Sequence, residues 1–132
     1  MDFSLFIIIG IILLLFCTLG LMALVFRGKK LSAPFVKKIK EYSQKTEKLS
    51  HRDQVLEYDK ILSLCLKELG YKGTLAEKMK AYGKDFKNEN AIWNAHKLRN
   101  KIAHEIDFQP SKKEYEVSLK AFKKEIRALT ST

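Results

Sequence analysis

Residues 51–69, HRDQVLEYDKILSLCLKEL, decide the fold of this chain. Their apolar side chains recur every three or four residues, which places them on one face of an α-helix. Ser50 and Asp53 have the spacing of a capping box at the start, and Gly70 follows the last apolar residue. The stretch predicts an amphipathic core helix, whose buried face is Val55, Tyr58, Ile61, Leu62, Cys65, Leu66 and Leu69.

The segments on either side show the same helical periodicity. Capping-box patterns start two of them, at Thr74-Leu75-Ala76-Glu77 and at Ser111-Lys112-Lys113-Glu114. No segment alternates with a period of two, as a half-buried strand would. The sequence therefore predicts an all-α bundle of four or five helices. Besides 51–69, the helices are expected over about 33–49, 74–82, 89–105 and 112–129.

Residues 3–26 carry no charge and are almost entirely apolar. At about 1.5 Å per residue, a helix of this length crosses a hydrocarbon layer of about 30 Å. A cleaved signal peptide is the competing interpretation, but such peptides begin with basic residues and end at a small-residue cleavage site. Here Asp2 is the only early charge. We expect residues 1–27 to form an uncleaved transmembrane anchor that inserts into the bilayer through residues 3–26.

The distribution of charge predicts the orientation of the anchor. Arg27, Lys29 and Lys30 follow the apolar stretch, while no Lys or Arg precedes it. By the positive-inside rule, we expect a single-pass protein of the cell membrane with its C-terminal domain in the cytoplasm. Without Asp2 and the apolar stretch, 25 Lys+Arg face 14 Asp+Glu, formally +11. Such a surface attracts anionic lipid headgroups or RNA, and charge alone does not choose between them.

The remaining chain divides into a basic juxtamembrane helix and linker over 28–48 and a helical domain over 49–132. The sparse apolar face of 33–49 suggests a helix close to the headgroups. Cys17 and Cys65 lie in different environments, which fits a reducing compartment. Cys65 is expected to be a small core residue rather than a reactive thiol.

Most of the chemistry-bearing residues fall in the helix over 89–105. His96 and His104 are eight residues apart, about 12 Å along a helix axis, whereas residues of one helix that chelate a single zinc ion usually lie four apart. No cysteine or carboxylate completes a ligand set, no nucleophile–histidine pattern occurs, and Gly70-Tyr71-Lys72-Gly73 lacks the spacing of a phosphate loop. We expect no metal and no cofactor.

Arg99, Asn100 and His104 remain as candidates. Asn100 and His104 are one turn apart on the same side of the helix. A histidine can move protons, an arginine can bind a phosphate and an asparagine can orient either one, which are the parts of metal-independent RNA cleavage. One helix supplies one such histidine, so a symmetric dimer would complete an acid–base pair. The alternative is structural: a solvated Arg99, an Asn100 bonded within the bundle and a His104 at the helix C-terminus.

The string Arg99-Asn100-Lys101-Ile102-Ala103-His104 resembles the Arg-x4-6-His motif of the HEPN superfamily, the higher eukaryote and prokaryote nucleotide-binding domain. The likeness covers roughly 49–129 and implies a HEPN-like helical bundle that dimerises with the motifs face to face. Active members are metal-independent endoribonucleases. The resemblance implies that Arg99 stabilises the scissile phosphate, Asn100 positions it and His104 is the general acid/base. His96 matches no position that the family requires and is kept only as an accessory candidate.

Two other functions stay open at this point. The domain can be a non-catalytic helical adaptor that binds a protein, a nucleotide or anionic lipid at the membrane. It can also be a structural part of a larger envelope complex, with the apolar anchor as its main functional element. Neither needs Arg99 or His104 to act on RNA, so the variants of these two residues separate the alternatives from the ribonuclease hypothesis.

Overall fold

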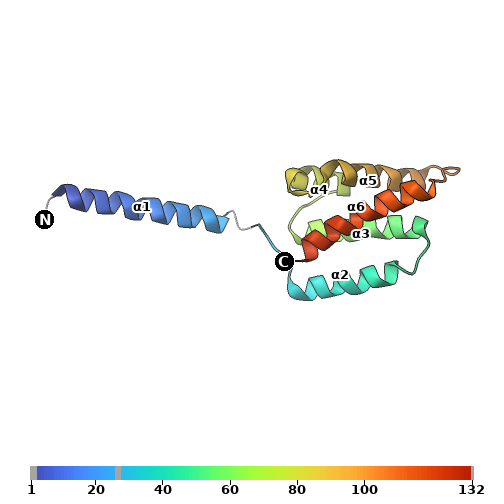
Figure 1. Cartoon of the computed structure of the whole chain (residues 1–132), viewed down its shortest axis with the longest axis horizontal. Helices are drawn as coiled ribbons and strands as arrows, with labels where there is room; N and C mark the ends of the chain where they lie inside the picture. Colours follow the sequence, from blue (N-terminus) through green and yellow to red (C-terminus); the bar gives the residue numbers. More distant parts are fainter. Residues whose placement is uncertain (1–2, 26–27, 132) are drawn as a thin grey trace.

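The computed structural model describes residues 3–25 and 28–131. Within these ranges every regular element is a helix (Figure 1). This confirms the prediction of an all-α chain with an N-terminal apolar helix and a helical bundle. In chain order the elements are α1 (Phe3–Val25), α2 (Ala33–Thr46), α3 (His51–Glu68), α4 (Leu75–Tyr82), a 3-10 turn (Gly83–Asp85), α5 (Glu89–His104) and α6 (Lys112–Thr130).

Helix α1 is long and apolar enough to cross a membrane. Its 23 residues extend about 35 Å at the usual rise of a helix. None of the side chains in the window Ser4–Leu21 is buried, so this window takes no part in the core of the bundle. The predicted anchor also includes residues 1, 2, 26 and 27, which lie outside the described residues.

Helix α3 is the centre of the bundle, and α2, α4, α5 and α6 all pack on it. Contacts between side chains give the helix directions. Arg52, near the start of α3, contacts Ile102 near the end of α5. Asp59, about two turns later in α3, contacts His96, which lies earlier in α5, so α5 is antiparallel to α3. The rings of His51 and Tyr115 are 6.1 Å apart, and Lys123 lies over the ring of Tyr58, so α6 runs parallel to α3.

The core consists of the apolar stripe of α3 and the facing side chains of the other helices. Its fully buried members include Val55, Ile61, Leu62, Leu66, Met79, Ile92 and Phe122. Cys65 is among them, and burial raises the pKa of its thiol to about 12. A thiol of this kind stays protonated at neutral pH and is a small core side chain, as the sequence predicts.

Local signals set the helix ends. Two of the three predicted capping boxes are complete: Thr74 and Glu77 start α4, and Ser111 and Glu114 start α6. At the start of α3 the Ser50 side chain accepts from the Asp53 amide at 3.2 Å, which is half of a capping box. After α3, Gly70 adopts a positive φ of 98°, and the Tyr71 amide donates to the Leu66 carbonyl at 3.0 Å. This hydrogen bond closes a Schellman motif, whose left-handed residue is usually glycine. The predicted helix boundaries therefore agree with the structure within about three residues.

Helix α2 belongs to the bundle. The sequence predicts a separate basic segment over 28–48, whereas Leu31 and Ile39 are buried in the same core as α3. Tyr42 donates a hydrogen bond to Glu57, and Tyr58 donates one to Glu47. These cross-helix bonds attach the Lys-rich segment to α3.

Glu125 of α6 is a buried carboxylate with an incomplete set of partners. Its Oε2 accepts from the Lys87 amide at 3.0 Å, while no group in the described part of the chain bonds its Oε1. Burial raises the pKa of Glu125, against the opposing effect of the Lys87 amide. A raised pKa means that Glu125 holds its proton more tightly in the folded protein than in the unfolded chain. Protonated Glu125 therefore stabilises the folded state fully below the pKa that it has in the unfolded chain, and this stabilisation is lost as the pH rises through the folded-state pKa.

We therefore expect Glu125→Gln to raise the free energy of unfolding by about 1 kcal/mol near pH 7, because the amide keeps the acceptor and removes the buried charge. The gain should shrink as pH falls toward the range where an unfolded glutamate takes up its proton. Circular dichroism measures this gain when the thermal unfolding of the full chain in detergent is recorded across the same pH range. Glu116→Gln, at an exposed position of the same helix, should show no such dependence. A gain that is equal at all pH values would contradict the assignment.

Candidate functional site

The candidate residues lie along the C-terminal half of α5. The Asn88 side chain caps the start of this helix by accepting from the Ala91 amide at 3.0 Å. At its other end, Arg52 of α3 donates to the Ile102 carbonyl at 3.2 Å, which satisfies one of the carbonyls that a helix end leaves unpaired. Ile92, Ala95 and Ile102 bury the apolar face. Helix α5 is thus held at both ends.

Four side chains form a closed ring of polar contacts between α3 and α5. Asp59 Oδ1 is 2.8 Å from His96 Nδ1, and Asp59 Oδ2 is 3.1 Å from Arg99 Nε. Asn100 bridges the other two members: its Nδ2 is 3.2 Å from His96 Nε2, and its Oδ1 accepts from Arg99 Nη1 at 3.1 Å. Each member therefore has two neighbours, and the ring ties a residue of α3 to three of α5.

Asp59 is the only acid of this ring, and its side chain is 6% exposed. Burying a lone carboxylate is unfavourable unless cations and hydrogen-bond donors compensate it. His96 donates from Nδ1 when it carries its proton there, which leaves Nε2 free to accept from Asn100. The Arg99 Nε contact is an ion pair without a directed hydrogen bond, since the Nε–H does not point along the line to Oδ2. The ring fixes the side chain of Arg99 from two directions.

Arg99 keeps part of its guanidinium accessible. Its side chain is 26% exposed, and Nη2 has no hydrogen-bond partner among residues 3–25 and 28–131. A planar guanidinium whose Nε and Nη1 are held and whose Nη2 remains free is a preorganised donor for an anion such as a phosphate. His96 differs from it, because His96 is buried and both of its ring nitrogens are engaged.

His104 is the last residue of α5 and is exposed. It lies five residues beyond Arg99, about 7.5 Å along the axis and about 140° around it. The described part of the chain gives it no hydrogen bond or ion pair. A single chain therefore brings Arg99 and Asn100 together and leaves His104 apart from them, one turn beyond Asn100 on a neighbouring part of the helix surface.

The bundle has two chemically different ends. We call the end with the start of α3 and the end of α5 the motif end; it carries Arg52 and His104. The opposite end, where Leu31 lies beside Leu69 and Leu129, is the linker end. Helix α3 has 18 residues and separates the two by about 27 Å. In Figure 1 the end of α6 lies at the linker end beside the start of α2.

Asp59 is the member of the ring that the sequence alone does not single out. It lies within the apolar stripe of α3, between Tyr58 and Ile61, where a carboxylate is unexpected. That position is the available signal, since an acid inside a core stripe needs a buried partner. The partner, 37 residues later in the chain, cannot be chosen from the sequence.

No group of three or more His, Cys, Asp and Glu side chains that could hold a metal ion occurs in the part of the chain that the structure describes. Comparisons with protein-family models, with curated proteins and with solved structures found no match. The ring around Asp59 and the exposed His104 are therefore the structural features on which a proposed function rests.

Proposed function

We propose that this chain is a membrane-anchored, metal-independent endoribonuclease that acts as a homodimer with a HEPN-like arrangement of its motifs. The observation that carries the proposal is the guanidinium of Arg99, which is fixed by Asp59 and Asn100 while its side chain stays 26% exposed. Held in this way, Arg99 presents a cation to a phosphate without first having to order its side chain.

The chemistry assigned to the residues is cleavage by the neighbouring hydroxyl of the ribose. One His104 removes the proton of the 2′-hydroxyl, whose oxygen then attacks the phosphorus. Arg99 stabilises the charge that accumulates on the phosphate oxygens, and Asn100 holds Arg99. A second histidine protonates the departing 5′-oxygen. The products are a 2′,3′-cyclic phosphate and a 5′-hydroxyl, so water enters no step.

In this proposal a second copy of the chain completes the acid–base pair. His96 is engaged inside the ring, and His104 is the exposed histidine of α5. The third histidine, His51, is exposed at the start of α3 and lies outside the string Arg99–His104. A two-fold axis near the end of α5 would place two copies of His104 and of Arg99 around one phosphate. The dimer is therefore part of the proposed mechanism.

A basic groove along α6 suits an RNA backbone. Four of its lining residues are cations and two, Glu47 and Glu116, are acids; the groove has a volume of about 580 Å³. Glu47 pairs with Lys123 at 2.8 Å, and the lining keeps an excess of positive charge. Because every RNA phosphate carries a charge, a row of cations attracts the backbone irrespective of sequence. The row runs along α6 and consists of Lys120, Lys123, Lys124 and Arg127.

Membrane anchoring through α1 completes the proposal. With Lys29 and Lys30 after the apolar helix, the bundle is assigned to the cytoplasm. Gly28 lies at the linker end and follows α1 by three residues, so this end stays within about 11 Å of the end of α1. The motif end is then the end remote from the anchor, where it is open to cytoplasmic RNA.

An RNA cleavage assay in EDTA tests this function. The full chain in detergent is incubated with single-stranded RNA, and the product ends are identified by mass spectrometry. We expect fragments with a 2′,3′-cyclic phosphate and a 5′-hydroxyl, formed at an undiminished rate in EDTA. Intact RNA at a large excess of dimeric protein, or products that carry a 5′-phosphate, would reject the proposal.

The ring of contacts also favours a second function, a non-catalytic adaptor at the membrane. A buried acid paired with a histidine and an arginine holds α3 and α5 together whether or not RNA is bound. In that case the exposed residues at the motif end form a docking surface for another molecule. A wild-type phenotype of the double variant Arg99→Ala, His104→Ala in cells would favour the adaptor over the ribonuclease.

A further inference from the structure

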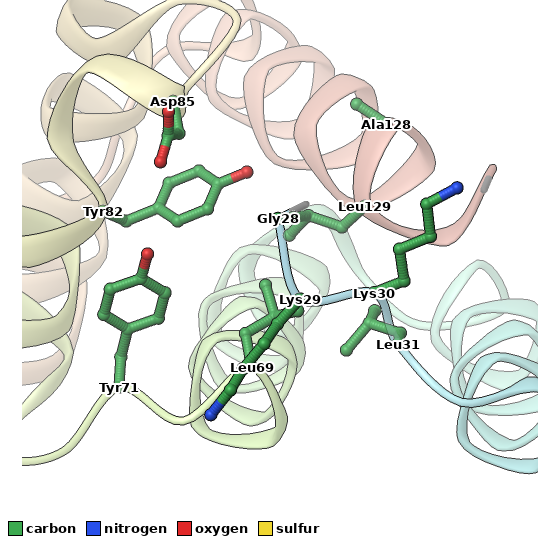
Figure 2. Close-up of a pocket in the computed structure, with 10 residues that line it drawn as sticks. All are labelled: Gly28, Lys29, Lys30, Leu31, Leu69, Tyr71, Tyr82, Asp85, Ala128 and Leu129. Carbon is green, nitrogen blue, oxygen red and sulfur yellow. The ribbon is translucent and has the colours of Figure 1, made fainter. Parts of the chain in front are cut away.

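A cavity of about 470 Å³ lies at the linker end, between the linker segment that follows α1 and the ends of three helices (Figure 2). This volume is in the range of small-molecule sites. The helices around it are α3, α4 and α6, so the cavity is formed only when the linker folds onto the bundle. Its lining is Gly28, Lys29, Lys30, Leu31, Leu69, Tyr71, Tyr82, Asp85, Ala128 and Leu129.

One side of this cavity carries hydrogen-bond acceptors. Figure 2 shows Tyr71, Tyr82 and Asp85 on the same side, with the Tyr82 hydroxyl directed toward Gly28. The Tyr71 and Tyr82 rings meet edge to face at 5.6 Å, and Phe86 packs against Tyr82 at 4.6 Å, which fixes the Tyr82 ring. Two phenol oxygens and a carboxylate on one wall suit the three N–H bonds of a primary ammonium.

The electrostatic surroundings of Tyr82 agree with a cation at this wall. Burial, followed by the charges of Glu125 and Asp85, raises the pKa of Tyr82 to about 12. The phenol therefore stays neutral at physiological pH, and the negative charges that raise its pKa would stabilise a positive group beside it.

The other side of the cavity carries one cation. Figure 2 shows the Lys30 side chain on the side opposite Asp85. The Lys29 side chain runs the other way, to the end of α3, where a Cβ built on Gly70 would be 2.9 Å from Lys29 Nζ. The Lys30 ammonium is therefore the group that can meet the single charge of a phosphodiester.

Apolar side chains form the floor between the two walls. Leu31, Leu69 and Leu129 are each less than a tenth exposed, and they separate the acceptors from Lys30. A ligand that spans this floor needs a negative group, a short carbon chain and a positive group in that order. A purely anionic lipid headgroup has no positive group for Asp85 to bind, so the carboxylate of Asp85 favours a ligand that also carries an ammonium.

We propose that this cavity binds a phosphodiester that bears a primary ammonium, and that its source is the ethanolamine headgroup of a membrane phospholipid. Lys30 binds the phosphate, while Asp85 and the hydroxyls of Tyr71 and Tyr82 bind the ammonium. The choice of a lipid source rests on the proposed membrane anchoring, because the cavity lies within about 11 Å of the end of α1. The site goes beyond the ribonuclease function and does not depend on it.

Binding of soluble headgroups to the full chain in detergent tests the chemistry. Isothermal titration is performed with glycerophosphoethanolamine, glycerophosphocholine and glycerol phosphate. We expect glycerophosphoethanolamine to bind about tenfold more tightly than the other two, which corresponds to about 1.4 kcal/mol. Equal affinities, or no saturable binding of glycerophosphoethanolamine, would overturn the proposal whether or not the protein cleaves RNA.

Variants of exposed side chains assign the two walls. Asp85→Asn should abolish the preference for glycerophosphoethanolamine over glycerol phosphate, and Lys30→Gln should weaken all three probes. Lys72→Gln and Asp107→Asn change exposed charges outside the cavity and serve as matched controls. Unfolding temperatures equal to that of the wild type show that the fold is intact. An unchanged preference in Asp85→Asn would overturn the ammonium assignment.

The source of the ligand is tested in nanodiscs. In discs that contain phosphatidylethanolamine, the lipid should occupy the cavity and prevent binding of added glycerophosphoethanolamine. In discs of phosphatidylglycerol alone, the added probe should still bind. Binding of the probe in both kinds of disc would show that the ligand is a soluble phosphodiester and that the lipid assignment is wrong.

Discussion

His104→Ala is expected to lower the rate of RNA cleavage by the full chain by about 10²–10⁴-fold, the usual effect of removing a general acid or base. His104 is exposed and has no partner in the described part of the chain, so alanine should leave the fold unchanged. The loss should therefore appear in the rate of cleavage and not in the unfolding temperature. Cleavage of a fluorescent single-stranded RNA in EDTA measures the rate.

Asn94→Ala is the matched control. Asn94 is another exposed polar residue of α5, and it lies ten residues before His104. This variant should cleave RNA at the wild-type rate. If His104→Ala retained full activity in a preparation free of contaminating nucleases, the ribonuclease mechanism would be wrong and the adaptor function would remain.

The dimer gives a second and independent expectation. When wild-type chains are co-expressed with an excess of His104→Ala chains, most wild-type subunits pair with an inactive one. At about ninefold excess, activity per wild-type subunit should fall to about one tenth if both copies of His104 are needed. Activity that remains proportional to the amount of wild-type chain would show that one subunit is sufficient.

Asp59→Ala is expected to reduce the free energy of unfolding by about 3 kcal/mol, the lower end of the range for breaking a buried ion pair. The lower end applies because one partner can adapt: the Arg99 side chain is already 26% exposed. For a domain of this size, such a loss lowers the unfolding temperature by roughly 10–20 °C. Thermal unfolding of the full chain in detergent, recorded by circular dichroism, tests the prediction.

Asp107→Ala serves as the control, because Asp107 is an exposed acid that forms no ion pair in the described part of the chain. It should change the unfolding temperature very little. The double variant Asp59→Ala, His96→Ala should be less destabilised than the sum of the two single variants, since both remove the same contact. Additive losses would show that the ring of contacts does not act as a unit.

The helices and their ends follow from the sequence alone. A capping box satisfies amides within the same turn, and the apolar stripe of 51–69 needs only the period of a helix. The pairs Thr74–Glu77 and Ser111–Glu114 therefore predict the starts of α4 and α6, and Gly70 predicts the end of α3. The apolar character of α1 is likewise a property of composition.

The sequence also singles out Arg99 and Asn100, because residues next to each other in a helix stay close whatever the rest of the chain does. It does not identify what holds them. Asp59 reaches His96 and Arg99 only because α3 and α5 pack antiparallel, and no local pattern determines which acid faces which base.

Tertiary packing likewise decided that α2 joins the bundle. Its apolar face is sparse, and only the contact of Ile39 with the core and the hydrogen bonds with α3 show that the face is buried. The cavity at the linker end has the same origin, because its residues come from four separate parts of the chain. Periodicity and capping act within one or two turns and can be recognised in sequence, whereas burial and charge pairing depend on distances that exist only after the helices have packed.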